Sequence, residues 1–185
     1  MNIKLPTKDA IIMAAFELYI ANPKASLGDI AEHAGVGRAT LHRYFPSRQE
    51  LAVALAKVAL RDLDEAVDKA TEHAESYTDA VKLMLEAVIP LADRQWFLLH
   101  EDLHGNEELD AEYQRQARET RELIEQVKQE GGFDADLPSA WIAAMIDGVV
   151  MSAWEFVGKG EATNKQACEL AWKSLMQGVG GKYDH

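Results

Sequence analysis

Residues 26–48, SLGDIAEHAGVGRATLHRYFPSR, decide the fold of this 185-residue chain, because they read as two short helices joined by a tight turn. Ser26 can cap the first helix, and the acidic residue three positions later completes a capping-box pattern. Gly35 can take the left-handed conformation that ends a helix without steric cost. Gly37 opens the second helix, and Pro46 ends it, since the residue before a proline avoids helical geometry. This order predicts a helix-turn-helix, the unit that places a recognition helix in the DNA major groove.

The outward side chains of the second helix are polar and suit contact with DNA. Arg38 can bond bidentately to guanine, whereas Thr40 and His42 can reach phosphates or base edges. Arg48, at the start of the following helix, can contact a phosphate. An ordinary helical hairpin with solvated charges is the alternative interpretation. The candidate DNA-contacting residues are Ser26, Leu27, Gly37, Arg38, Thr40, His42, Arg43, Tyr44 and Arg48.

The same stretch resembles the signature of a known family. The run IAEHAGVGRATLHRYFPSRQEL is similar to that of TetR-type transcriptional regulators, without a gap, over about the first 50 residues. It departs from the signature at Gly37, where Ser is usual, at His42, where Tyr is usual, and at Arg48, where Lys is usual. The resemblance implies a homodimeric regulator, with an N-terminal module that binds operator DNA and a helical body that dimerises and binds an inducer. It also implies that the protein is a repressor, and that binding of a ligand releases it from DNA.

Helical periodicity runs through the whole chain, and strand signals are weak, so the expected class is all-α. We expect an N-terminal three-helix module, joined by one continuous helix to a larger C-terminal helical domain, with about nine helices in all. The expected domains are 1–48, which binds DNA, and 49–185, which binds ligand and dimerises.

The charge is distributed unevenly along a chain whose formal net charge is −12. The first 48 residues carry six basic and four acidic side chains, whereas the remainder carries 13 basic and 27 acidic ones. The positive charge therefore lies where the helix-turn-helix is expected, and an acidic body would repel DNA if it faced it. An acidic protein with no nucleic-acid partner would have the same net charge.

The sequence gives no positive indication of a membrane protein. No uninterrupted run of 18 apolar residues occurs, and the N-terminus lacks the basic-then-apolar order of a signal peptide. A single cysteine, Cys168, is typical of a reducing compartment. We therefore expect a cytoplasmic protein without a membrane partner.

A stripe of small residues marks the helix expected over residues 138–159. Ala140, Ala144, Gly148 and Ser152 recur every four residues, which lets another backbone come close. Together with the last helix, we expect this stripe to form a four-helix interface with a second copy of the chain. The residues expected there from the last helix are Ala167, Ala171 and Leu175.

The C-terminal region also holds many aromatic and methionine side chains. Such a set at helical spacing indicates a core, and the alternative is a partly open apolar pocket. An acidic group beside indole rings would suit a cationic or amphipathic ligand through cation–π contact. The resemblance implies an inducer site in this region, and the candidate residues are Trp96, Phe97, His100, Trp141, Met145, Asp147 and Trp154.

A different class of function is suggested by residues 100–104, HEDLH, which match the H-E-x-x-H pattern of zinc proteases. On a helix, His100 and His104 would share a metal, and Glu101 would act as general base. Gly105 follows at once and breaks the helix that such a site needs. No phosphate-binding glycine loop, cysteine cluster or Gly-x-Ser-x-Gly elbow occurs, so we expect no cofactor and no enzymatic activity.

Overall fold

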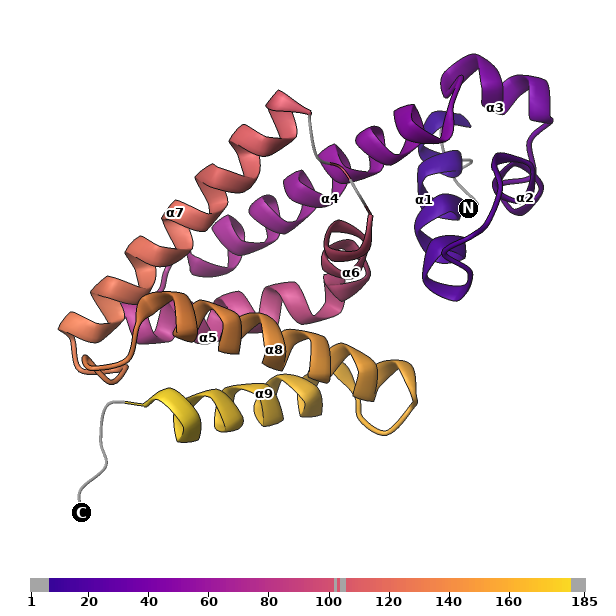
Figure 1. Ribbon diagram of the computed structural model, residues 1–185. Coiled ribbons are helices and arrows are strands. Elements are labelled where there is room, and N and C mark those ends of the chain that lie inside the picture. Colours follow the sequence, from indigo (N-terminus) through magenta and orange to yellow (C-terminus); the bar gives the residue numbers. More distant parts are fainter. Residues whose placement is uncertain (1–6, 102, 104–105, 181–185) are drawn as a thin grey trace. The chain divides into compact units, whose positions relative to one another are not determined.

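The structure is a computed structural model that describes residues 7–101, 103 and 106–180. Within those residues the chain forms nine α-helices and one short 3-10 helix, and its one β contact is an isolated bridge between Phe133 and Gly180 (Figure 1). The predicted all-α class is therefore confirmed. The helices are α1 (Thr7–Ala21), α2 (Leu27–His33), α3 (Arg38–Tyr44), α4 (Arg48–Thr71), α5 (Tyr77–Val88), η1 (Ile89–Leu91), α6 (Ala92–His100), α7 (Glu107–Gln129), α8 (Ser139–Gly158) and α9 (Asn164–Val179).

The chain divides into two compact units. Unit 1 comprises the chain up to Arg61 together with Asp93–Leu109, and unit 2 comprises Asp62–Ala92 together with the chain from Asp110 onward. Helix α4 runs without a break through the boundary between them, as the sequence predicts. The packing boundary lies beyond residue 48, because the first part of α4 and all but the first residue of α6 belong with the helix-turn-helix. The division into 1–48 and 49–185 remains a prediction about function.

The local signals in the helix-turn-helix act as the sequence predicts. The Ser26 hydroxyl accepts a hydrogen bond from the Asp29 amide at 3.2 Å, and the Ser26 amide donates to the Asp29 carboxylate at 2.8 Å. This reciprocal pair satisfies two amides at the start of α2. Gly35 has a φ of +66°, the left-handed conformation that a side chain would make costly. Gly37 caps α3 with its backbone alone, because it has no side chain to accept from the first turn.

Helix α6 is packed on α1 within unit 1 through aromatic contacts. The Phe97 ring meets the Phe16 ring edge-on at 5.5 Å and stacks against the Tyr19 ring at 6.0 Å between centroids. All three side chains are buried, and the Arg94 guanidinium lies 4.3 Å from the Phe16 ring centroid. Phe97 is thus a core residue of unit 1, and its place in the ligand-binding set stays a prediction. Its burial comes from long-range packing against α1, which periodicity within α6 does not reveal.

The core of unit 2 is built from α5, α7, α8 and α9, with η1 joining α5 to α6. Its fully buried side chains include Val81, Leu85, Ile124, Ile142 and Leu175. Helices α8 and α9 pack side by side (Figure 1). Leu175 is therefore part of its own unit's core and is corrected from an interface residue to a core residue.

The start of α5 is capped by Ser76, whose hydroxyl accepts from the Asp79 amide, and also by a residue far away in sequence. Glu130, just after α7, accepts hydrogen bonds from the Tyr77 amide at 3.1 Å and from both the amide and hydroxyl of Thr78. These bonds, the Thr78 hydroxyl first, hold the pKa of Glu130 below its usual value. A negative charge at a helix N-terminus also complements the helix dipole. At the other end, α5 stops at Val88, two residues before Pro90, as expected because the residue before a proline avoids helical geometry.

Helix α8 is apolar, yet the rest of the chain buries only a small part of it. An 18-residue window has a mean hydropathy of 1.4, and only 22% of that window is buried. By length and composition alone this helix could cross a membrane, which the sequence reading did not anticipate because Asp147 interrupts its apolar run. An exposed helix with this composition needs another apolar surface to cover it. A helix that forms a protein–protein interface is likewise apolar and little buried within its own chain.

Candidate DNA-binding site and regulatory surfaces

Helix α3 is anchored by apolar residues and presents polar ones. Leu41 is fully buried and Phe45, directly after the helix, is nearly so. Arg38, His42 and Arg43 are exposed. The buried pair fixes the helix in unit 1, so its opposite side presents donors that base edges and phosphates accept. The structure therefore puts the predicted recognition residues on an accessible face of one short helix.

The remaining candidate contacts lie on α3 itself and at the start of α2. Tyr44 is exposed, and the Arg43 guanidinium lies 5.5 Å from its ring centroid, whereas Thr40 is half-buried. At the start of α2, Ser26 is exposed and Leu27 is half-buried. The Ser26 hydroxyl already bonds to the Asp29 amide, so this oxygen serves first as a helix cap.

Arg48 has several partners inside unit 1, which the sequence did not reveal. Its guanidinium donates to the Ala25 carbonyl, the Pro23 carbonyl and the Glu101 carboxylate, each at 2.9 Å. It also lies 4.7 Å from the ring centroid of Tyr19. Burial raises the pKa of Tyr19, while the charge of Arg48 opposes that rise. Arg48 therefore ties the α1–α2 connection, α1 and the end of α6 to the first turn of α4.

The predicted ligand-binding residues are distributed over both units. Trp96 and His100 belong to α6 in unit 1, where their rings stack at 4.3 Å between centroids and the imidazole Nδ1 lies 2.8 Å from the Trp96 carbonyl oxygen. Trp141, Met145, Asp147 and Trp154 belong to α8 in unit 2. Trp141 is 57% exposed, and Met145 and Trp154 pack partly against the core of unit 2.

The predicted small-residue stripe lies open on α8. Ala140, Ala144, Gly148 and Ser152 are all exposed, and a Cβ atom added at Gly148 would meet nothing within 4 Å. The predicted partners on α9 differ, because Ala167 and Ala171 are buried. They line the floor of a groove instead of standing out from the surface.

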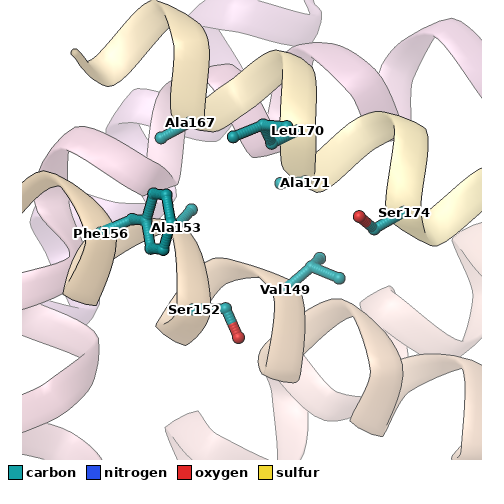
Figure 2. A pocket seen from close by; sticks show the side chains of 8 residues that line it. All are labelled: Val149, Ser152, Ala153, Phe156, Ala167, Leu170, Ala171 and Ser174. Atoms are coloured by element: carbon teal, nitrogen blue, oxygen red, sulfur yellow. The ribbon is translucent and has the colours of Figure 1, made fainter. Parts of the chain in front are cut away.

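That groove, of about 290 Å³, runs between α8 and α9 (Figure 2). Figure 2 shows the Phe156 and Val149 side chains reaching from α8 toward those of Leu170 and Ser174 on α9. Phe156 is 44% exposed and Leu170 is 51% exposed, so the rim carries large apolar groups. These rim residues are not among the predicted interface residues, although their helical spacing from the small residues indicates them.

The structure describes only part of the H-E-x-x-H pattern. His104 lies outside the described residues, and the Glu101 carboxylate is paired with Arg48. Among residues 7–101, 103 and 106–180, no group of three or more His, Cys, Asp or Glu side chains could hold a metal ion. The described residues instead offer an exposed polar helix in unit 1 and an uncovered apolar face in unit 2.

Comparison with known proteins finds similarity in the helix-turn-helix region and along most of the chain. Residues 11–55 match a family described as bacterial regulatory proteins, tetR family. The chain is 27% identical over 174 residues to the HTH-type transcriptional repressor LfrR of Mycolicibacterium smegmatis, a match that covers 94% of this chain and 90% of the relative.

Solved structures give the same result for the fold. The structure of LfrR from Mycobacterium smegmatis in complex with proflavine superposes with a TM-score of 0.78 at 26% identity and covers 94% of this chain and 96% of that one. A TetR family regulator from Marinobacter aquaeolei VT8 gives a TM-score of 0.76 at 17% identity, with 95% and 96% of the two chains covered, and so shares the fold.

Proposed function

We propose that this chain, which is similar to the TetR family of helix-turn-helix transcriptional regulators, is a DNA-binding repressor which a small molecule releases from its operator. The observation that carries the proposal is the exposed polar face of α3, held in place by Leu41 and Phe45. The similarity to the repressor LfrR supports the direction of regulation.

We assign sequence readout to α3 and positioning to its surroundings. Arg38 is the residue best suited to base recognition, because its planar fork can bond to guanine O6 and N7 together. His42, Arg43 and Tyr44 suit backbone contacts, as do the amides near Gly37. Arg48 combines the internal bonds described above with a side chain that is 43% exposed, so a phosphate can still approach it.

The proposed assembly is a homodimer formed through α8 and α9. Two observations support a second copy as the cover for α8: its exposed small-residue stripe and the apolar groove beside it. A two-fold dimer would present two copies of α3 to successive major grooves, about 34–36 Å apart on B-DNA. The acidic C-terminal region would lie away from the phosphates, as the uneven charge requires.

The proposed effector is an aromatic cation or a similarly apolar amphiphile. LfrR has been crystallised with proflavine, an aromatic cationic dye, and this chain holds exposed indole and carboxylate groups on α8. Indole faces attract cations, and Trp141 and Asp147 are our candidates for such contacts. Release of DNA by a factor of about a hundred requires roughly 2.7 kcal/mol of coupling, within the usual range for allostery. We further propose that the protein acts in the cytoplasm and is not an enzyme.

Selection of bound duplexes from a random DNA pool tests this function. We expect enrichment of an inverted repeat, and we expect Arg38→Ala to cost about 1–3 kcal/mol for that repeat while relaxing preference at one base pair per half-site. A panel of aromatic cations should then lower binding to the selected DNA. Failure of the purified protein to enrich any sequence at low salt would refute the proposal.

A further inference from the structure

Gly28 is a glycine in the first turn of α2 whose own backbone does not require one. Among the described residues, the glycines with positive φ are Gly35, Gly131 and Gly160, so Gly28 has a conformation open to any residue. Glycine in a helix is less favourable than alanine by up to about 1 kcal/mol. A reason for glycine at this position must therefore come from what lies beside it.

The space beside Gly28 is filled by the guanidinium of Arg38, from the start of α3. A Cβ atom at Gly28 would stand 3.2 Å from each of three guanidinium atoms, Cζ, Nε and Nη2. Because these atoms are coplanar and equally distant, the flat face of the guanidinium lies against α2 at this point. Carbon atoms make comfortable contacts at about 3.5–4.0 Å, so even a methyl group would move the guanidinium by a few tenths of an ångström.

A nearby carboxylate favours the same placement of Arg38. Hydrogen bonds from the Ser26 amide and hydroxyl lower the pKa of Asp29, and the charge of Arg38 lowers it further. Asp29 thus stays ionised and attracts the guanidinium toward the first turn of α2. The space beside Gly28 and the charge of Asp29 together favour this position of the guanidinium.

We propose that Gly28 is a specificity-determining position that acts through Arg38, by leaving room for its guanidinium to lie flat on α2 before DNA arrives. A bidentate bond to guanine depends on the orientation of the planar fork, and ordering it beforehand reduces the entropy lost on binding. A side chain at position 28 pushes the fork away from this orientation. The inference rests on the proposed function and names a residue that none of the candidate DNA contacts included.

The test compares Gly28→Ala and Gly28→Leu with Arg38→Ala in the selected operator and in operators altered one base pair at a time. We expect Gly28→Leu to lower discrimination at the base pair that Arg38 reads by about 5- to 150-fold, the value of one bidentate contact, and Gly28→Ala to have a smaller effect in the same direction. In an Arg38→Ala background, Gly28→Leu should change discrimination at that base pair less than about twofold.

Gly158→Ala is the control, because a Cβ atom there, unlike one at Gly28, meets nothing within 4 Å and the position lies at the end of α8. It should leave base discrimination unchanged, and thermal unfolding should show that all variants are folded. Equal weakening of every DNA sequence by Gly28→Leu, or an undiminished effect in the Arg38→Ala background, would overturn the inference while leaving the proposed function intact. Lack of any selected sequence with the wild-type protein would instead refute the function itself, and the inference with it.

Discussion

Gly148→Leu tests assembly separately from folding. Within one chain the new side chain has open space beside α8, whereas in the proposed dimer it would meet the second copy. Gly148 lies in the middle of α8 on its exposed face, where a Cβ atom meets nothing within 4 Å. Leucine is a better helix former than glycine by roughly 0.5–1 kcal/mol. We therefore expect the isolated subunit to be as stable as the wild type or slightly more stable.

The proposed dimer should respond in the opposite direction. A larger side chain in a closely packed helix contact costs about 1–3 kcal/mol. A two-fold interface contains the substitution twice, so the dimer should lose about 2–6 kcal/mol. That loss weakens self-association by roughly 30- to 20,000-fold. Operator binding should fall with it, since two half-sites are then bound by separate monomers.

Sedimentation over a range of protein concentrations measures this effect, and urea unfolding monitors the fold. Gly158→Leu is the control, because it makes the same chemical change at another open glycine of α8. We expect Gly148→Leu to give a folded monomer at concentrations where the wild type and control are dimers. A Gly148→Leu dimer as tight as that of the wild type would show that this face of α8 is not the interface.

Three further outcomes are expected. Arg48→Lys should lower the free energy of unfolding by about 1–3 kcal/mol in urea, because an ammonium cannot reproduce a guanidinium fork shared by two carbonyls and Glu101; unchanged stability would contradict this role. Glu130→Gln should cost about 0.5–2 kcal/mol near neutral pH. The pKa of Glu130 is lowered in the folded state, so this stabilisation is complete above the unfolded-state pKa and is lost as pH falls through the folded-state pKa. The difference between wild type and variant in urea should therefore shrink on acidification, and a constant difference would exclude a charge effect. Trp141→Ala should reduce both the fluorescence quenching and the DNA release caused by aromatic cations, and leave ligand-free binding to the operator nearly unchanged.

The sequence by itself determined the helix-turn-helix and the all-α class. The signals that bound these helices act on backbone groups within one or two helical turns, so their effects can be read from neighbouring positions. They are the capping box at Ser26, the left-handed Gly35 and the N-cap Gly37. The same holds for the end of α5 before Pro90. The open face of α8 could likewise be anticipated from the four-residue spacing of its small side chains.

Only the tertiary structure decided how distant residues are used. Phe97 serves the core of unit 1 because α6 returns to α1, and Arg48 bonds to Glu101, 53 positions away. Glu130 caps a helix that begins some 50 residues earlier, and Arg38 lies flat on Gly28. Each of these contacts joins segments whose approach depends on the packing of whole helices. Local propensity fixes where helices begin and end, but it carries no information about which buried faces meet, and so the sequence could not supply these pairings.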